Sequence, residues 1–515
     1  MEQLSAMDAM FAYTETNSTP MHIGQMAIYD PSTAPGGKVG FKDILRYIES
    51  RLDGARIFRQ KLARVPLDLD HPYWIDDENF DLEYHVRHIA LPHPGDWRQL
   101  CIQAARIYAR PLDMDRPLWE FTVIEGLDNV EGCPKGSFAV LQKMHHAAVD
   151  GQSGLAMTMA LHDFDAKMAP RQFDDIYNPE PTPSPLSLLM KAQVNNIANP
   201  VRGLKQLQNL LPVSKRMMDF SRQYKQADDA KSRPPKTRFN VKISPHRVFD
   251  AQSFSLADIK KIRTAFPGKT VNDVMLTIVG GTMRRYLESK KELPATTLKV
   301  GAPVSVRGDN SKAAGGNQVS MMQVGIGTHI ADAGERLEFV YKETSRSKVM
   351  NEALGARTIM DISGALPAGL TAAGTKLAIR MGLAQTMNPQ INSVVTNVPG
   401  PPVTMFFAGA EMKLAYGMGL VSDGLGVFHV VGSYNGDVLL SFLADRELVP
   451  DPDFYRACAV ESFKALMASA KKASSATAKK AKAKPKAKKA SKKPKKRVTA
   501  SAATAGRARR KTARK

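Results

Sequence analysis

Hydrophobic and polar positions in the first part of the chain follow helical and strand periods in alternation. The segment 41–52 (FKDILRYIESRL) has apolar side chains three and four residues apart, the spacing of a helix with one buried face. Segment 96–110 has the same period, whereas 119–127 (WEFTVIEGL) and 137–144 (SFAVLQKM) are apolar runs of strand length. This mixture predicts a layered α/β domain over residues 1–170.

A second region with the same mixture of periods runs over residues 241–467. Three helices are predicted there, at 256–266, at 271–290 and, as a closing helix, at 454–469. The predicted strands are 298–306, 392–398 and 437–445. Residues 171–240 contain the proline-rich PEPTPSPLS followed by helix-compatible sequence, so we expect an interdomain linker with one or two helices.

The last part of the chain differs from the rest in composition and charge. The formal net charge is +22, but residues 471–515 hold 20 lysines and arginines and no acidic residue, which leaves +2 for the first 470 residues. Residues 468–515 are rich in Lys, Ala and Pro and poor in large apolar side chains, which predicts a disordered cationic tail. The folded body is therefore expected to be nearly neutral.

Composition argues against several classes of protein. Three widely spaced cysteines without a CxxC pair argue against a disulfide framework and a cysteine-based zinc site, and they favour a reducing cytoplasm. We expect no signal peptide and no transmembrane helix, because neither a basic and apolar leader nor a window of 18 apolar residues is present. The sequences GxSxG, Walker A and GxGxxG are also missing, which argues against an α/β-hydrolase and against nucleotide binding by those loops.

The sequence HHAAVDG at 145–151 is the strongest candidate for chemistry. It directly follows the predicted strand 137–144, whose end would hold an imidazole rigidly at the rim of a cleft. The pKa of an unperturbed histidine is about 6.5, and this value suits the removal of a proton from an attacking alcohol at neutral pH. We therefore predict that His146 is a general base. The alternative is a structural histidine that is bonded to backbone groups at the end of the strand.

The neighbours of His146 are predicted to support it. Adjacent residues of a strand point to opposite faces, so His145 is expected to pack rather than to face the same cleft. Asp150 and Gly151 would close the turn, and Asp150 is expected to form a structural ion pair, with Arg307 as one candidate partner. The alternative is that Asp150 orients His146 as in a catalytic triad.

Seven segments in a fixed order together point to one protein family. They are TPMHIG (19–24), PLDMDRPLWE (111–120), HHAAVDG (145–151), VNDV (271–274), PVSVR (303–307), GGNQVS (315–320) and TNVPGP (396–401). In this combination the chain resembles the bacterial wax ester synthase/diacylglycerol acyltransferase family over residues 1–467. That family is part of the CoA-dependent acyltransferases, which include chloramphenicol acetyltransferase and condensation domains. HHxxxDG is shared by all of them, whereas PLW, ND and NVPGP are more specific to this branch.

The resemblance implies an α/β fold of two chloramphenicol-acetyltransferase-like domains with an active-site tunnel between them. It implies that His146 is the catalytic base. The residues that would support it are His145, Asp150, Gly151, Asn272 and Asp273. The residues that would line the tunnel are Pro117, Leu118, Trp119, Asn397, Pro399 and Gly400. For the PLW residues, packing at the start of a strand is the alternative, and we favour it.

The implied reaction is direct transfer of a long-chain acyl group from acyl-CoA to a fatty alcohol, to diacylglycerol, or to both. His146 would take the hydroxyl proton while the oxygen attacks the thioester, and hydrogen-bond donors would stabilise the oxyanion. A thiol is a good leaving group, so we expect no metal and no cofactor beyond acyl-CoA as co-substrate. The alternatives are another HHxxxDG acyltransferase of the condensation type, or a non-catalytic lipid-granule or nucleic-acid-binding protein.

The cationic tail predicts polyanionic partners. An anionic membrane, the surface of a lipid droplet and nucleic acid all fit its charge, and the alternative is a solubilising appendage without a partner. The expected location is the cytoplasm, with peripheral attachment to the inner membrane or to lipid inclusions.

Overall fold

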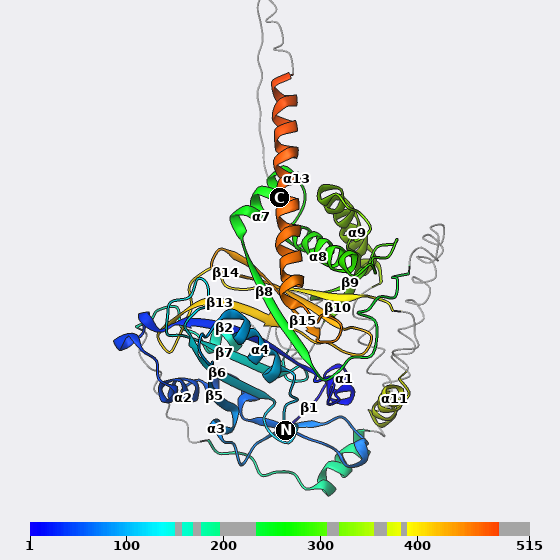
Figure 1. The fold of residues 1–515 in the computed structure, drawn as a ribbon. Coiled ribbons are helices and arrows are strands. Elements are labelled where there is room, and N and C mark those ends of the chain that lie inside the picture. The colour runs from blue at the N-terminus through cyan, green and yellow to red at the C-terminus, as the bar shows by residue number, and fades with distance from the viewer. Residues whose placement is uncertain are drawn as a thin grey trace, which may run out of the picture.

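Two six-stranded sheets form the body of the protein, one built mainly from each half of the chain (Figure 1). The computed structural model describes residues 1–149, 157–167, 177–195, 233–305, 319–354, 368–382 and 389–483. One hydrophobic cluster contains strand residues of both sheets, for example Val140 and Leu443, so the two halves pack directly against each other.

The first sheet has the strand order β12-β13-β2-β7-β6-β5. Its strands are β2 (His22–Asp30), β5 (Val86–Ala90), β6 (Trp119–Leu127), β7 (Ser137–His145), β12 (Phe406–Phe407) and β13 (Ala410–Met418). Every residue of β7 is buried, because β2 and β6 pair with its two edges and side chains cover both of its faces. The structure confirms the strands predicted at 119–127 and 137–144.

The second sheet has the strand order β10-β9-β11-β14-β15-β8. Its strands are β8 (Arg247–Ser255), β9 (Lys299–Ser305), β10 (Val319–Gly325), β11 (Ser393–Pro399), β14 (Val427–Tyr434) and β15 (Asp437–Asp445). The helices of this half are α7 (Leu256–Ala265), α8 (Val271–Ser289), α9 (Ala333–Leu354) and α13 (Pro452–Ala483). The predicted helices at 256–266, 271–290 and 454–469 and the three predicted strands of this region are confirmed.

Smaller elements complete the first half of the chain. A three-stranded sheet has the order β1-β4-β3, formed by β1 (Glu2–Gln3), β4 (Tyr73–Asp76) and β3 (Gln60–Ala63). The helices are α1 (Ala6–Thr14), α2 (Phe41–Glu49), α3 (Leu82–His85) and α4 (Trp97–Tyr108). Helices α2 and α4 confirm the predictions at 41–52 and 96–110. The 3-10 helices are η1 (Pro31–Thr33), η2 (Pro35–Gly37), η3 (Leu52–Gly54), η4 (Arg56–Phe58) and η5 (Pro66–Asp68).

Two segments of the second half cross over to the first. Strands β12 and β13 lie in the range 241–467 that was predicted as one C-terminal domain, yet β13 pairs with β2 of the first sheet. The crossover covers the open edge of β2 and buries Phe407 and Met412 in the shared cluster. Helix α11 (Ala368–Arg380) also crosses over, and its Ala372 packs in a cluster with residues of α1. The sequence division at residue 241 therefore does not follow the sheets at these two segments.

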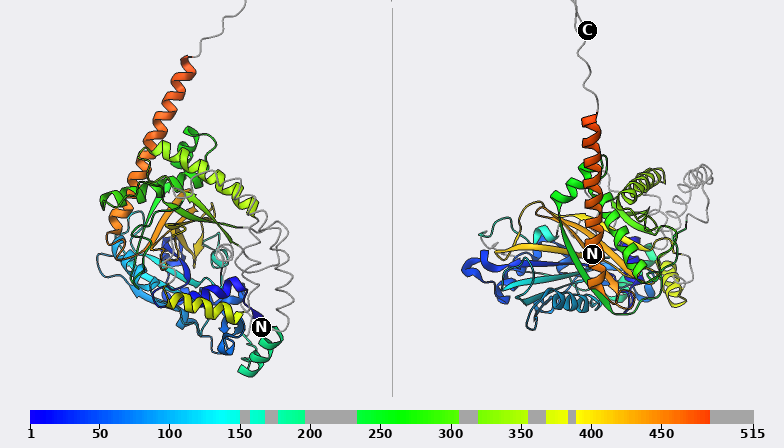
Figure 2. Two further views of the ribbon diagram at one scale, coloured as in Figure 1. Left: turned by 90° about the vertical axis from the view of Figure 1, so that its right-hand side faces the viewer. Right: turned by 45° about the horizontal axis from the view of Figure 1, so that its top comes forward.

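The predicted tail begins later than expected. Helix α13 runs to Ala483 and projects from the body as a long rod (Figures 1 and 2), so residues 468–483 of the predicted disordered segment are helical. Alanine and lysine have high helix propensity, and the first proline of the tail, Pro485, lies just beyond the end of the helix. Residues 484–515 lie outside the described parts of the chain. Among the described helices, none is both long and apolar enough to cross a bilayer.

A buried carboxylate joins the two halves and makes stability depend on pH. Asp250 of β8 is fully buried and accepts a hydrogen bond from Trp97 Nε1 of α4 at 2.8 Å, and Arg456 Nε lies 3.3 Å from the same oxygen. Burial raises the pKa of Asp250 to about 6, above its ordinary value of about 4. A raised pKa means that the folded state holds this proton more tightly, so the stabilising contribution is present at low pH and is lost as pH rises through about 6.

We therefore expect the variant Asp250→Asn, which cannot ionise, to gain stability relative to the wild type as pH rises from about 4 to about 7. The gain in the free energy of unfolding should be about 3 kcal/mol, which corresponds to the rise of about two units in the pKa of Asp250. Urea unfolding of both proteins across this pH range measures the difference, because all other groups titrate equally in both. A difference that stays constant with pH would show that the pKa of Asp250 is the same in the folded and unfolded states.

Candidate active site

Strand β7 ends at the first residue of the HHxxxDG sequence and fixes the histidine pair between two neighbouring strands. The backbone N–H of His145 donates to the carbonyl of Leu118 at 2.9 Å, and the N–H of His146 donates to the carbonyl of Met21 at 2.8 Å. Leu118 directly precedes β6, and Met21 directly precedes β2. The motifs TPMHIG, PLW and HHxxxDG therefore meet at one end of the first sheet.

Both ring nitrogens of His145 are engaged in hydrogen bonds inside the protein. Its Nδ1 accepts from the backbone N–H of Ala147 at 3.0 Å, so Nε2 carries the proton of the neutral ring and donates it to Glu15 at 3.1 Å. The side chain is completely buried. This arrangement leaves His145 without a nitrogen for proton transfer and lets it hold the turn of residues 145–148, in which the Ala148 N–H donates to the His145 carbonyl.

The imidazole of His146 is half-buried and lies against α1. Its ring stacks on Phe11, with 4.0 Å between the ring centroids and 10° between the planes. Phe11 lies within α1 and Glu15 is the residue that directly follows it, so the two histidines contact this helix and its C-terminal end. The alternation expected within a strand does not extend to His146, because β7 ends at His145 and His146 already belongs to the turn.

The PLW residues are all buried behind the histidine pair. Leu118 packs with Ala147 in one small cluster, and Trp119 contacts the rings of Phe58 and His85. The Trp119 indole N–H donates to the carbonyl of Phe58 at 3.0 Å. These contacts favour packing at the start of β6 over lining of a tunnel for Pro117, Leu118 and Trp119.

The ND residues have two separate environments. Asp273 is buried and closes the N-terminus of α8: its carboxylate accepts from Thr270 N at 2.8 Å and from Thr344 Oγ1 at 2.6 Å. This is a capping box, and its role is structural. Asn272 instead accepts from Asn397 Nδ2 at 3.4 Å, so the ND and NVPGP motifs meet through these two amides.

The remaining predicted residues lie apart from the histidines or outside the described chain. Pro399 ends β11, and a Cβ at Gly400 would lie 2.2 Å from the carbonyl oxygen of Ser433, so only glycine fits this close approach. Asp150 and Gly151 lie outside the described residues, as does Arg307, so the ion pair predicted for Asp150 stays a prediction.

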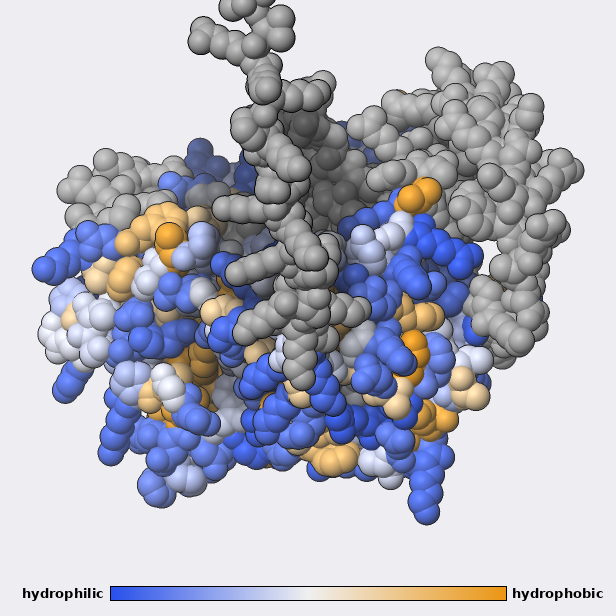
Figure 3. Space-filling model, turned by 90° about the horizontal axis from the view of Figure 1, so that it is seen from above, coloured by the Kyte–Doolittle hydropathy of each residue, from blue (hydrophilic) through white to orange (hydrophobic). Residues whose placement is uncertain are grey.

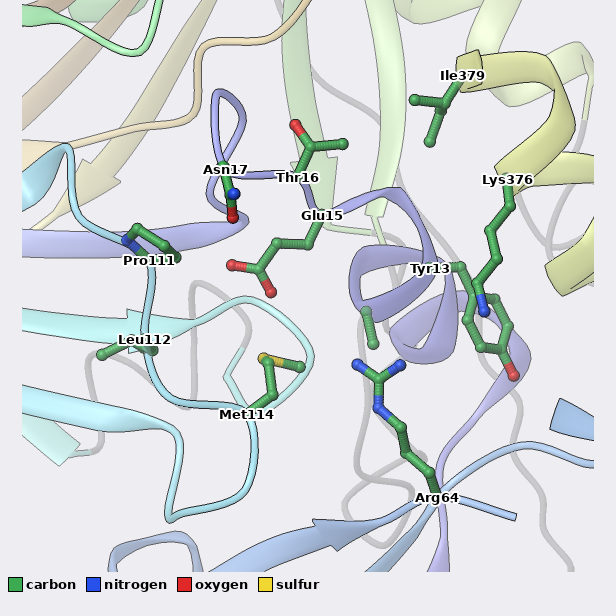
Figure 4. A pocket seen from close by; sticks show the side chains of 11 residues that line it. Tyr13, Glu15, Thr16, Asn17, Arg64, Pro111, Leu112, Met114, Lys376 and Ile379 are labelled. Atoms are coloured by element: carbon green, nitrogen blue, oxygen red, sulfur yellow. The ribbon is translucent and has the colours of Figure 1, made fainter. Parts of the chain in front are cut away.

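A cavity of about 400 Å³ lies at the end of α1, and one of its lining residues, Glu15, is the hydrogen-bond partner of His145 (Figure 4). Glu15, which binds His145, points into it from the end of α1, and Met114 and Leu112 form an apolar wall opposite. Arg64 and Lys376 add two cations to its rim. The cavity therefore combines an apolar wall with charged groups, which suits an amphiphilic substrate.

Sequence reasoning missed the contribution of the N-terminal helix to this site. Glu15 and Phe11 lie in no recognised motif, and they meet the histidines only because the fold brings together segments about 130 residues apart. His22 in TPMHIG offered a signal. It lies opposite His145 in the sheet, and its Nε2 donates to the carbonyl of Tyr108 at 2.6 Å. Burial lowers the pKa of His22 well below its ordinary value, so the ring is neutral at physiological pH.

Comparison with known proteins places the chain in a family. Residues 4–275 match the wax ester synthase/diacylglycerol acyltransferase catalytic domain, and residues 315–467 match the C-terminal domain of the same family. The chain belongs to the wax ester synthase/diacylglycerol acyltransferase family. A Mycobacterium tuberculosis (strain CDC 1551 / Oshkosh) protein that bears the name of a diacylglycerol O-acyltransferase is 31% identical over 456 residues, which cover 88% of this chain and 87% of the relative. Another such protein, from strain ATCC 25618 / H37Rv, is 30% identical and covers 87% of this chain and 93% of its own.

Solved structures confirm the fold of this wax ester synthase/diacylglycerol acyltransferase family member. The family enzyme of Marinobacter aquaeolei VT8 has a TM-score of 0.64 and 24% identity, with 91% of this chain and 99% of that chain covered. A starter condensation domain of rhizomide synthetase, solved with C8-CoA and Leu-SNAC, has a TM-score of 0.52 and 13% identity, with 91% and 94% covered. The predicted class, two chloramphenicol-acetyltransferase-like α/β domains, is thereby confirmed.

The hydrogen bond between Glu15 and His145 yields a stability prediction. Glu15→Ala is expected to lower the free energy of unfolding by about 1–3 kcal/mol, because the buried Nε2–H of His145 loses its acceptor. Glu15→Gln keeps an amide oxygen in this place and should lose less. Denaturant unfolding measures both, with Glu49→Ala on the exposed side of α2 as the control that should change little. Equal losses for the alanine and glutamine variants would contradict the assigned bond.

Proposed function

We propose that this protein transfers a fatty acyl group from acyl-CoA to the hydroxyl of diacylglycerol or of a long-chain alcohol, with His146 as the general base. Family membership supports the class of enzyme, an acyltransferase that uses acyl-CoA. The observation that carries the residue assignment is the division of roles within the pair. His145 is buried with both nitrogens bonded, whereas His146 is half-buried and is fixed through its backbone and by Phe11.

The reaction balances without a further group. His146 takes the hydroxyl proton as the oxygen attacks the thioester carbonyl, and the new C–O bond forms. The tetrahedral intermediate then collapses, the C–S bond breaks, and the protonated His146 returns the proton to the CoA thiolate. The products are one ester and one free thiol, so the proposal includes acyl-CoA as co-substrate and no other cofactor.

The proposed acceptors differ in what supports them. Diacylglycerol is favoured by the names of the mycobacterial relatives, and both acceptors by the name of the family. The apolar wall of Leu112 and Met114 beside Glu15 is proposed to contact an acyl chain of the acceptor. Asn272 and Asn397, which meet between α8 and β11, are proposed to belong to the wall of the substrate tunnel together with Pro399 and Gly400.

Release of the CoA thiol from palmitoyl-CoA tests the proposal. We expect release that depends on added hexadecanol or dioleoylglycerol, with the matching ester recovered from the lipid extract in equal amount. Release that depends on an amine acceptor instead would indicate a condensation-type enzyme. No release with any acceptor would indicate a non-catalytic protein, and either result would overturn the proposal.

The partners of the cationic tail are a separate proposal. Exposed Lys471 and Lys472 mark the part of α13 where the positive charge of residues 471–515 begins. We propose that this segment binds a polyanion, either an anionic lipid surface at the inner membrane or a lipid inclusion, or nucleic acid. Deletion of 484–515, which holds 15 of the 20 lysines and arginines of this segment, should strongly weaken salt-sensitive binding to both phosphatidylglycerol vesicles and duplex DNA. Unchanged binding to both would show that the tail is not the segment that binds polyanions.

A further inference from the structure

Exposed apolar side chains gather at one end of the protein. Fifteen large apolar side chains are exposed among the described residues, and eight of them lie in three short segments, 67–69, 186–194 and 377–381. These segments are the end of η5, the helical residues 185–195, and the end of α11. We call them together the apolar end. It lies at the bottom of Figure 1, away from the projecting part of α13.

Leu67 is the most exposed of these residues and is held in an unfavourable backbone conformation. Its side chain is 88% exposed, and its φ of 58° lies in the left-handed region, as does that of the next residue, Asp68, at 50°. A branched side chain in this region costs conformational energy, and its exposure to water costs hydration energy. Residues with such backbone strain are more common at functional sites than elsewhere.

The helical residues 185–195 carry apolar side chains on two opposite faces. Leu188 and Ala192 pack against Val65 and Tyr73 in a small cluster of the first half. Leu186, Met190 and Val194 follow one another at four-residue spacing on the other side, and each is at least 60% exposed. A surface helix of a soluble protein normally has charged residues on its outer face, so this outward stripe is an apolar surface without a partner among the described residues.

Named contacts hold the three segments side by side. Lys376 of α11 forms an ion pair with Asp68 of η5. Asn195 Nδ2 donates to Asp70 at 2.8 Å, which joins the helical residues 185–195 to the same stretch of chain. The opposite end of the molecule is less apolar. Seen from above, its visible described residues are mostly hydrophilic, with scattered apolar patches (Figure 3).

The apolar end adjoins the cavity that Glu15 lines. Ile379 belongs to both, since it is among the exposed apolar residues of α11 and also lines the cavity. Lys376 and Arg64 line the same cavity (Figure 4). Ile379 of the apolar end, these two cations and Glu15 therefore share one cavity.

We propose that the apolar end docks on a phospholipid surface and that the acceptor lipid enters the cavity from that surface. The choice of a lipid surface follows from the chemistry of the acceptor, because diacylglycerol and long-chain alcohols dissolve in lipid and not in water. In this respect the inference rests on the proposed function. Leu67 and the outward stripe of residues 186–194 insert among acyl chains, while Arg64, Lys376 and Lys191 lie near the headgroup phosphates.

Flotation of the full chain with phosphatidylcholine vesicles at high salt tests the docking, because these conditions suppress binding through the cationic tail. The wild type should float with the vesicles. The variant Leu67→Ser/Met190→Ser/Val194→Ser should lose at least about tenfold of the floating fraction. The matched control Met321→Ser/Val349→Ser/Val403→Ser replaces three exposed apolar residues on other elements and should float like the wild type. Equal flotation of both triple variants would overturn the proposal.

Further measurements separate docking from folding, self-association and catalysis. All six positions are exposed, so near-wild-type thermal unfolding should show that both triple variants fold. Light scattering of the vesicle-free protein should give the same mass for wild type and variant. A dimeric wild type together with a monomeric apolar-end variant would assign the surface to a second copy of the chain and overturn lipid docking. With a water-soluble short-chain alcohol the variant should keep the wild-type rate, whereas with vesicle-borne dioleoylglycerol it should lose rate. If the wild type transfers no acyl group to any acceptor, the proposed function is wrong. The flotation experiment would still show whether the apolar end binds the vesicles.

Discussion

His146→Ala is expected to lower the turnover number of acyl transfer by about 10²–10⁴-fold and to leave the fold intact. An alcohol is a weak nucleophile at neutral pH, and the loss of a positioned general base typically costs a factor of this size. The backbone of residue 146 is held by its bond to Met21, which alanine keeps. The stacking contact with Phe11 is lost, at a cost in stability of about 1 kcal/mol. Thiol release from palmitoyl-CoA gives the rate, and circular dichroism reports the fold.

Two other histidine variants make this result specific. His88→Ala removes a half-exposed histidine on the edge strand β5 and should leave the turnover number unchanged. His145→Ala removes two buried hydrogen bonds and should lower the free energy of unfolding by several kcal/mol, which His146→Ala should not do. A folded His146→Ala protein with the wild-type turnover number would exclude His146 as the base.

Trp119→Ala is expected to destabilise the protein by about 3–5 kcal/mol, the usual cost of removing a large aromatic side chain from a core. Trp119 is among the largest fully buried side chains. Its ring contacts Phe58, His85 and Phe121, with centroid distances of 5.3, 4.5 and 4.8 Å. Because its role is packing, the fraction that remains folded should keep a KM and a turnover number close to those of the wild type.

The smaller variant Trp119→Phe separates the ring from its hydrogen bond. It keeps most of the apolar contacts and leaves the carbonyl of Phe58 without its indole donor, so we expect a loss of about 1–3 kcal/mol. Denaturant unfolding gives the stabilities, and the acyltransferase assay below the unfolding transition gives KM. A raised KM with unchanged stability would mean that Trp119 lines the tunnel after all.

Sequence patterns predicted the elements whose burial is nearly uniform. Strands β6 and β7 were found with errors of at most one residue, because both are continuous apolar runs with turn residues on either side. Helix α8 was found for a related reason: its long apolar stripe begins after Thr270, which caps it together with Asp273. The position of His146 after a buried strand followed directly from these patterns.

Contacts between distant segments could not be predicted in the same way. The pairing of β13 with β2 joins residues about 390 apart, and no local period encodes which sheet a strand enters. Glu15 binds His145 across 130 residues for the same reason. The helical residues 468–483 were missed because a composition that cannot form a core can still extend a helix that begins in the body.

The release of CoA thiol in the absence of acceptor tests the central claim most directly. In direct transfer, the C–S bond breaks only when an acceptor hydroxyl attacks, so the wild type mixed with excess palmitoyl-CoA should show no rapid burst of thiol. Addition of dioleoylglycerol or hexadecanol should then start release, with one ester formed per thiol. A burst of one thiol per protein without acceptor would reveal an acyl-enzyme intermediate and would contradict His146 acting as the base of a direct transfer.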